Sequence, residues 1–284
     1  MLPIGRYLLI LALMACVSAP SALAWGALGH RTVAAIAMLL IPEKAGKMDL
    51  ILAQLEMDGN FIDAASYPDE FIRDHDPEHK FEAWHYAGLP DDGMPFVCGD
   101  CLFKALPAEL AILRRGGGGK AEAVAIAWVE HLVGDLHEPL RMDGRLRGGR
   151  LFHVSYRGIK ACDDFTKKDP KFNLQTVWED CLVEELAAGR NPKALAKDLL
   201  GDIKTYKGRP EIGHASRHPW LAWGTESHAL AVSVAFDHLQ EGADLQDAYI
   251  LGDGNGALSV VRQQLLLAGI RLAFLLDQNF GSGS

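Results

Sequence analysis

The chain has 284 residues, a length that allows one large domain or two small ones. Apolar residues make up 49% of it and charged residues 23%, which excludes a disordered or collagen-like protein. The formal net charge of −9 leaves no general basic surface for duplex nucleic acid. Any phosphate chemistry therefore needs a local source of positive charge, and a bound metal ion is the obvious one.

The first 24 residues have the pattern of a secretory signal peptide. Arg6 is the only charged residue among them, an apolar run follows it over 7–17, and Ala22-Leu23-Ala24 offers a small-residue cleavage site. We therefore predict a signal peptide over 1–24 and one exported domain over 25–284, which begins at Trp25 and is periplasmic or secreted. The alternative is acylation at Cys16, as in a lipoprotein, although Met14 fits that pattern poorly.

Four cysteines remain after the signal peptide: Cys98, Cys101, Cys162 and Cys181. An even number in an oxidising compartment favours disulfide bonds. A zinc cluster is the less favoured use, because only Cys98 and Cys101 form a close pair. The connectivity stays open, although pairing Cys98 with Cys101 and Cys162 with Cys181 would close the shortest loops.

The exported sequence predicts helices along nearly its whole length. In chain order we expect them over 30–40, 43–56, 120–136, 177–188, 192–200, 220–239 and 257–279. One strand is expected over 151–156, in a short β-hairpin that turns at Arg157-Gly158. Arg271 interrupts the apolar run 265–276, which is too short to span a bilayer, so no membrane span is expected. With no internal repeat and no linker, the sequence predicts a single all-α domain.

Two polar residues share one face of the predicted helix over 120–136. His131 and Asp135 lie four positions apart, so their side chains leave the helix on the same side. An imidazole and a carboxylate are ligands that zinc accepts. Taken alone, such a pair is ordinarily a surface ion pair or a helix-end interaction.

Three further segments carry residues of the same chemistry. Asp69 follows Pro68, His85 stands between two aromatic residues, and His30 lies five residues after Trp25. Cleavage before Trp25 would free its α-amine as a nitrogen ligand. Singly, Asp69 is typical of a turn, His85 of a satisfied core histidine, and Trp25 of a frayed terminus.

Together these residues resemble the S1/P1 nuclease family in order and spacing. The resemblance covers nearly all of the exported chain and implies the mostly helical fold shared by phospholipase C and P1 nuclease. It is carried by Trp25-Gly-Ala-Leu-Gly-His30, Ser66-Tyr67-Pro68-Asp69, Trp84-His85-Tyr86, His131-Leu-Val-Gly-Asp135-Leu-His-Glu-Pro-Leu140, Gly148-Gly149, Asn173-Leu174 with Val177-Trp178, Trp223-Gly-Thr-Glu-Ser227 and the segment 267–273.

The resemblance implies zinc-dependent hydrolysis of phosphodiester bonds in single-stranded DNA and RNA, and many members of the family also remove 3′-phosphates. It implies that one zinc is held by Asp69, His85, His131 and Asp135. A second would be held by the amine and carbonyl oxygen of Trp25, by His30 and by Asp135, which bridges the two. Two adjacent divalent ions lower the pKa of a shared water, supply hydroxide at neutral pH and clamp the phosphate.

The third zinc of the family is not expected here. The family pattern has His, His and Asp where this chain has Arg141, Gln175 and Glu179. Arginine stays protonated and only donates, so it is no zinc ligand. His137, six residues after His131, lies too far round the helix to replace it. We expect two zinc ions per chain.

We interpret Arg141 as a fixed cation in place of the third metal. Its expected partner is Glu179, with Gln175 hydrogen-bonded nearby, and its guanidinium would stabilise charge on phosphate oxygens during catalysis. The alternative is that the Arg141–Glu179 ion pair merely fills an inactive site.

Recognition of the nucleic acid is expected at two residues. Tyr86 would stack a base, unless it packs in the core beside Trp84. Arg73, close to Asp69 in sequence, would reach a phosphate. Two other functions stay open, a zinc phosphomonoesterase or phospholipase C-like hydrolase and a metal- or nucleotide-binding pseudoenzyme without turnover. No stable protein partner is predicted.

Overall fold

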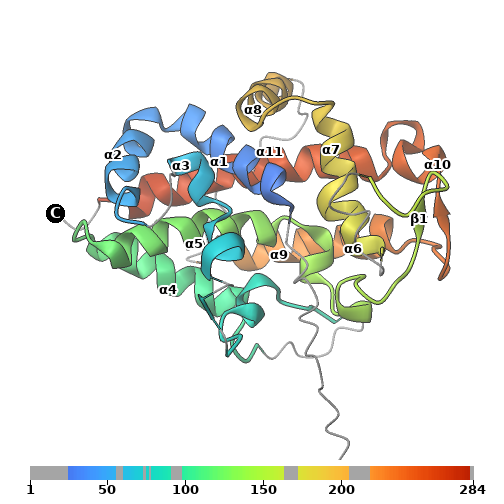
Figure 1. Ribbon diagram of the computed structural model, residues 1–284, viewed down its shortest axis with the longest axis horizontal. Helices are drawn as coiled ribbons and strands as arrows, with labels where there is room; N and C mark the ends of the chain where they lie inside the picture. Colours follow the sequence, from blue (N-terminus) through green and yellow to red (C-terminus); the bar gives the residue numbers. More distant parts are fainter. Residues whose placement is uncertain are drawn as a thin grey trace, which may run out of the picture.

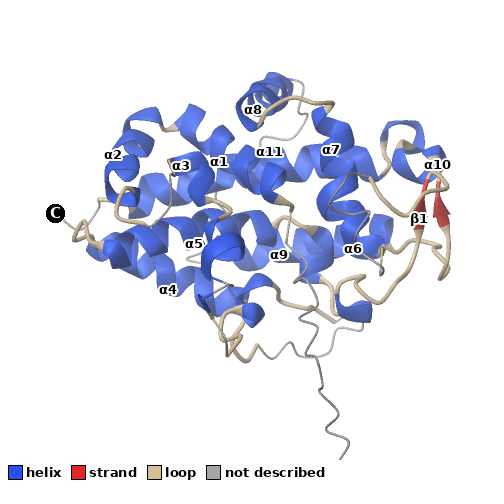
Figure 2. Cartoon of the chain, in the orientation of Figure 1, coloured by secondary structure: helices blue, strands red, loops and turns tan. Residues whose placement is uncertain are grey.

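The computed structural model describes residues 25–55, 60–72, 75–76, 78–90, 98–162, 172–204 and 218–281. The predicted signal peptide, Cys16 and Arg73 lie outside these residues. Most of the described chain is helical (Figure 2), which confirms the predicted all-α class.

The α-helices vary from one short turn to 23 residues. They are α1 Ala27–Leu40, α2 Pro42–Leu52, α3 Phe61–Ala64, α4 Leu102–Arg115, α5 Lys120–Leu136, α6 Leu174–Thr176, α7 Leu182–Ala187, α8 Pro192–Gly201, α9 Pro219–Leu230, α10 Asp247–Ile250 and α11 Ala257–Asn279. Short 3₁₀ turns lie at Glu82–His85, Pro139–Met142, Arg145–Arg147, Asp202–Lys204 and Gly252–Gly254, and π turns at Pro68–Ile72, Val177–Cys181 and Ala231–Ala235.

The long helices α5 and α11 begin and end where the sequence predicts. α5 follows a four-glycine loop, in which Gly116 to Gly118 adopt positive φ, and it ends before Pro139. The predicted helix over 177–188 begins as a π turn and continues as α7, whereas the one over 220–239 passes from α9 into a π turn and ends at Ala235. α4 was not predicted, because Pro107 in its interior obscures the pattern. Its buried leucines still follow helical spacing, at positions 102, 106, 110 and 113.

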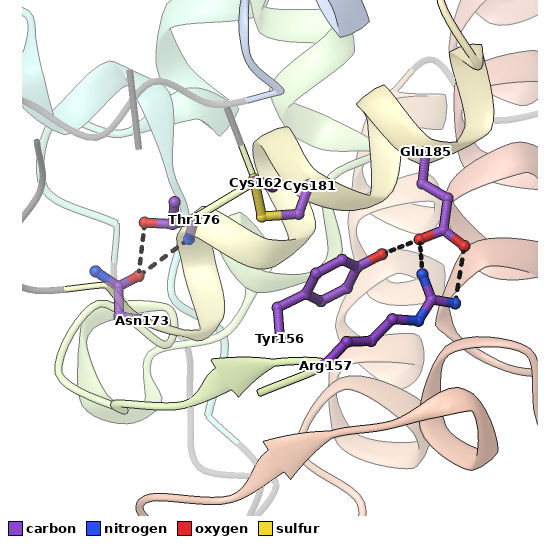
Figure 3. The surroundings of a disulfide bond; sticks show 7 residues. All are labelled: Tyr156, Arg157, Cys162, Asn173, Thr176, Cys181 and Glu185. Carbon is purple, nitrogen blue, oxygen red and sulfur yellow. Dashed lines mark hydrogen bonds and ion pairs between the residues drawn. A yellow bond between two sulfur atoms is a disulfide. The ribbon is translucent and has the colours of Figure 1, made fainter. Parts of the chain in front are cut away.

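The described sheet is smaller than predicted and differently paired. The strands β1 Ser155–Tyr156 and β2 Asp244–Leu245 have two residues each and pair in parallel. The predicted turn at Arg157-Gly158 is present, closed by one antiparallel bridge between Tyr156 and Ile159. Beyond this turn, Cys162 is joined to Cys181 in the Val177–Cys181 turn by a disulfide (Figure 3).

Both cysteine pairs that close the shortest loops are bonded. Cys98 bonds to Cys101 and Cys162 to Cys181. The cysteines therefore form disulfides and not a zinc cluster, as predicted.

The core is built around α1, α5 and α11. α1 and α11 lie side by side through the middle of the molecule (Figure 1), and both also contact α5, which packs along α4. By length and composition α11 would be long enough to cross a bilayer, but 72% of its apolar window is buried inside the fold. The predicted absence of a membrane span stays a prediction.

Candidate metal centre and active-site cavity

Four side chains from three segments meet above the last turns of α5. α5 supplies His131 and Asp135, both fully buried. Asp69 lies in the π turn that begins at Pro68, and His85 ends the 3₁₀ turn Glu82–His85. The structure thus brings together the four residues that the sequence predicts as one ligand set.

Aromatic packing positions His85 over α5. The ring of Trp84, next to His85 in the chain, lies 4.8 Å from that of Phe81 and 4.9 Å from that of Trp128 on α5. Trp128 precedes His131 by three residues, so one helix face carries both the anchor and the ligand. The 3₁₀ turn is therefore held directly above the pair on α5.

Donor atoms of these four residues approach one another at distances close to those in a tetrahedral site. His85 Nδ1 lies 2.9 Å from His131 Nε2, 3.1 Å from Asp135 Oδ2 and 3.8 Å from Asp69 Oδ1. His131 Nε2 lies 3.3 Å from Asp135 Oδ2 and 3.7 Å from Asp69 Oδ2. A tetrahedral zinc with bonds of about 2.0–2.1 Å has donor atoms roughly 3.3 Å apart. The residues present therefore fit a zinc ion.

His131 is oriented by the main chain. Its Nδ1 lies 2.9 Å from the carbonyl oxygen of Ala65, so Nδ1–H donates there and Nε2 offers its lone pair to the cluster. This arrangement fixes both the tautomer and the direction of the ring.

A further donor, His30, faces the other oxygen of Asp135. His30 on α1 is fully buried, and its Nε2 lies 3.5 Å from Asp135 Oδ1. Neither atom has a hydrogen-bond partner among the residues that the structure describes. Buried polar atoms without partners are costly, and a bound cation would satisfy both. Asp135 thus approaches His85 and His131 with one carboxylate oxygen and His30 with the other.

Trp25 is fixed beside His30. The Trp25 side chain is fully buried, and its Nε1 donates to the carbonyl oxygen of Gly134 over 2.8 Å. The next residue, Gly26, donates its N–H to the carbonyl oxygen of Glu179 over 2.9 Å. The first residue of the predicted exported chain is therefore anchored from both sides.

Gly134 is a site residue that sequence reasoning missed. A Cβ at Gly134 would lie 2.6 Å from His30 Nδ1, closer than side-chain atoms approach. Only glycine at this position lets α1 bring His30 against α5. The detectable signal is a glycine inside an otherwise apolar helix, one position before Asp135.

The protonation of the cluster follows from burial and mutual charge. Burial would lower the pKa of His131, but the carboxylates of Asp135 and Asp69 outweigh it and raise that pKa to about 9, so a zinc ion would have to displace the proton from Nε2 before this nitrogen could ligate. Burial would raise the pKa of Asp135, yet the imidazoles of His131 and His85 hold it well below its ordinary value. For His30, burial and the neighbouring His131 lower the pKa, so its imidazole stays neutral and able to ligate.

Arg141 and Glu179 form a buried ion pair next to the cluster. Arg141 Nη2 lies 2.9 Å from Glu179 Oε1, and both side chains are buried. Burial opposes the charge on Arg141, but Glu179 and Asp135 outweigh it and raise the pKa of the guanidinium. Gln175 is also buried, but the predicted hydrogen bond is lacking at its Oε1, which has no partner within the described residues. An amide oxygen, one carboxylate and a guanidinium do not fit a third zinc.

A cavity of about 680 Å³ opens onto both groups. Asp69 and His85 line it from the cluster, and Arg141 and Gln175 line it from the ion pair. Tyr86 lies on its wall with 43% of its surface exposed, so it is not packed in the core beside Trp84. The cavity is therefore the place where a ligand would reach the candidate metal centre.

Comparison with known proteins identifies the family. The family model described as S1/P1 Nuclease matches residues 25–281. The chain belongs to the S1/P1 nuclease family. Because S1/P1 nucleases are hydrolases, this family membership confirms the prediction that the protein is an enzyme of the hydrolase class.

The protein matches several named nucleases over most of its own length and theirs, at low sequence identity. It is 25% identical to Endonuclease 4 of Arabidopsis thaliana, over 92% of this chain and 91% of that protein. It is 23% identical to Nuclease S1 of Aspergillus oryzae, over 89% and 91%, and 24% identical to Nuclease P1 of Penicillium citrinum, over 91% and 98%. A solved structure of the alpha toxin from Clostridium absonum aligns with a TM-score of 0.42 and 14% identity, over 94% of this chain and 66% of the toxin.

His137, six residues after His131, lies outside the cluster, as the helix geometry predicts. His137 caps α5, and its Nε2 lies 3.0 Å from Arg271 Nη1 on α11. A neutral imidazole accepts from the guanidinium there, since burial and Arg271 lower the pKa of His137. Its ring therefore joins α5 to α11.

Proposed function

We propose that the protein is an exported, zinc-dependent phosphodiesterase that cleaves single-stranded DNA and RNA, with 3′-nucleotidase activity, and that it holds two zinc ions per chain. The observation that carries this proposal is the donor geometry. Four donor side chains approach one another at 2.9–3.8 Å, and Asp135 Oδ1 faces His30 Nε2 with neither atom hydrogen-bonded among the described residues.

One zinc would be held by Asp69, His85, His131 and Asp135. The second would be held by Asp135, His30 and the amine and carbonyl oxygen of Trp25. Bound zinc supplies positive charge at a phosphate and lowers the pKa of coordinated water. Asp135 would be shared by the two sets, because its Oδ2 lies 3.3 Å from His131 Nε2 and its Oδ1 lies 3.5 Å from His30 Nε2.

Arg141 and Tyr86 would act on the substrate. Arg141 is a permanent cation on the cavity wall, and its fork of N–H donors matches phosphate oxygens. Tyr86 offers an exposed ring on the same wall, where a base can stack.

Export is supported by two observations. Both pairs of cysteines are disulfide-bonded, as is common in oxidising compartments. The family match begins at Trp25, directly after the predicted cleavage site. The signal peptide over 1–24 and the domain over 25–284 are part of this proposal.

The test is metal analysis of protein that begins at Trp25, followed by parallel assays on single-stranded DNA, RNA, 3′-nucleotides and phosphatidylcholine. We expect about two zinc ions per chain and hydrolysis of the nucleic acids. Asp135→Asn should lose both metals and all activity, while the exposed control Asp237→Asn should keep both. Two bound zinc ions without hydrolysis of any substrate would contradict the enzyme and leave a metal-binding protein; hydrolysis of phosphatidylcholine alone would indicate a phospholipase.

The number of zinc ions has its own test at the substituted positions. The triple variant Arg141→His, Gln175→His and Glu179→Asp restores the donor types of the family pattern. We expect its zinc content to rise from about two to about three per chain. Three tightly bound zinc ions in the unaltered protein would contradict the proposed count.

A further inference from the structure

The segment after Pro139–Met142 contains a left-handed turn. Four consecutive residues have positive φ: Leu146 at 46°, Arg147 at 55°, Gly148 at 62° and Gly149 at 77°. Residues other than glycine enter this region at an energetic cost, and usually singly. Here two such residues adjoin two glycines, and strained backbone of this kind concentrates at binding sites.

Neighbouring contacts hold the turn in this conformation. Leu151 donates its N–H to the carbonyl oxygen of Leu146 over 3.0 Å, and Gly149 donates to that of Arg145 over 3.2 Å. A Cβ at Gly148 would lie 2.6 Å from the carbonyl oxygen of Leu140, so this part of the turn is pressed against the chain beside Arg141. These contacts hold the turn beside Arg141.

Arg145, the residue before the turn, forms an ion pair and a cation–π contact outside the turn. Arg145 pairs with Asp143, at 2.7 Å between Nη2 and Oδ2, and its guanidinium lies 4.3 Å from the centre of the Phe236 ring. Arg145 thus neutralises the carboxylate that Asp143 contributes to the cavity wall. Its role is to anchor the turn.

The turn presents Arg147 to the cavity. Arg147 is exposed and lines the same cavity as Asp69 and His85, with Arg150 beside it. The described part of the chain holds no hydrogen-bond or ion-pair partner for the Arg147 side chain. The turn thus places on the cavity wall a cation that no described side chain pairs with.

We propose that Arg147 forms a second phosphate subsite, which binds the phosphate of a single-stranded nucleic acid next to the one at the metal centre. This inference rests on the proposed function, because the metal centre defines the reacting phosphate. A guanidinium binds phosphate oxygens through paired N–H donors. A second contact favours a strand over a mononucleotide, which has no neighbouring phosphate.

The test measures binding and hydrolysis of a strand by the zinc-loaded protein. A fluorescent phosphorothioate oligothymidylate, which resists cleavage, is titrated at several salt concentrations, and Arg147→Ala is compared with Arg114→Ala. Arg114 is an exposed arginine at the end of α4, outside the cavity lining, so its loss gives the same change in net charge. We expect Arg147→Ala to weaken binding about tenfold and to reduce the slope of log K against log salt by about 0.7, the value for one phosphate on a single strand. Arg114→Ala should match the unaltered protein.

Two further variants separate recognition from folding. Arg147→Gly removes the guanidinium but suits the positive φ, so its Tm should equal or exceed that of the unaltered protein while binding is lost. Arg147→Lys keeps a cation and should restore most of the salt slope. Hydrolysis of a small ester with a single phosphate should fall much less than hydrolysis of a single-stranded oligonucleotide in Arg147→Ala and Arg147→Gly, because no neighbouring phosphate is present.

The possible outcomes distinguish the subsite from the enzyme. Strand binding that depends on Arg147, without any hydrolysis, would support the subsite and overturn the proposed function. Hydrolysis together with binding that is equal in Arg147→Ala and Arg114→Ala would overturn the subsite alone. An unaltered protein that binds no strand also overturns the subsite.

Discussion

At position 141 this chain has an arginine where the family pattern has a histidine, so the positive charge there comes from a side chain and not from a metal ion. A guanidinium carries its charge at every physiological pH, whereas a metal ion must be captured from solution. That charge is buried, and the 2.9 Å contact with Glu179 compensates it. Either partner left alone would be an uncompensated charge in the protein interior.

A double-mutant cycle at this ion pair tests whether Arg141 acts in catalysis or only forms a structural ion pair with Glu179. Arg141→Met and Glu179→Met should each reduce the free energy of unfolding by about 3–5 kcal/mol, because each strands a buried charge. The double variant should recover most of that stability, as measured by urea unfolding. If Arg141 stabilises charge on the substrate, the stable double variant should lose about 100-fold in kcat. Full activity in the double variant would show that the pair only fills space.

The residues of the site were predictable to different degrees. The pairing of His131 with Asp135 follows from helical spacing alone. Asp69 and His85 required the family motifs, because a π turn and an aromatic cluster bring them to α5. Gly134 was not predictable, because its importance depends on how closely α1 approaches α5 in space.

At the scale of elements, α1 and α5 meet through that glycine, and a matched pair of variants tests the contact. Gly134→Ala places a methyl group where the His30 ring lies, so it should displace His30 and lower the zinc content from about two to about one per chain. Gly46→Ala is the control, since Gly46 lies within α2 with no atom within 4 Å of its Cβ position. This control should keep both metals and gain about 0.5–1 kcal/mol in stability from helix propensity. Equal zinc content in both variants would contradict the role of Gly134.

The elements themselves were predictable where local pattern decides them. α5 and α11 have clear starts and ends in the sequence, which the structure reproduces. α4 was missed because a proline inside a helix argues against it, and burial of its leucines against α5 outweighs that cost. The parallel pairing of β1 with β2 joins segments almost 90 residues apart, which no local pattern reveals.

At the scale of the molecule, a buried carboxyl group links stability to pH. Burial on α4 raises the pKa of Glu109 to about 7. Between about pH 4.5 and pH 7 the unfolded chain loses this proton while the folded protein keeps it, so stability falls as the pH rises. Above pH 7 both states are ionised and the loss is complete.

Glu109→Gln should therefore gain stability relative to the unaltered protein as the pH rises. The difference in free energy of unfolding between the two proteins should shift by about 2–3 kcal/mol in favour of the variant between pH 4 and pH 8. Urea unfolding at both pH values, with the same zinc concentration for each protein, measures this change. The exposed Glu43→Gln should show the pH dependence of the unaltered protein. A Glu109→Gln variant with unchanged pH dependence would mean that Glu109 is ionised in the fold.

Maturation of the whole chain should control metal loading. Trp25 is already anchored, by its ring on Gly134 and by the contact of Gly26 with Glu179, so cleavage needs only to free its amine. Protein that begins at Trp25 should bind about two zinc ions, whereas protein with one additional alanine before Trp25 should bind about one and lose hydrolysis, because an amide nitrogen does not ligate zinc. An alanine added after Ser284 is the control and should change neither quantity. Two zinc ions in the N-terminally extended protein would show that the second site forms without the free amine.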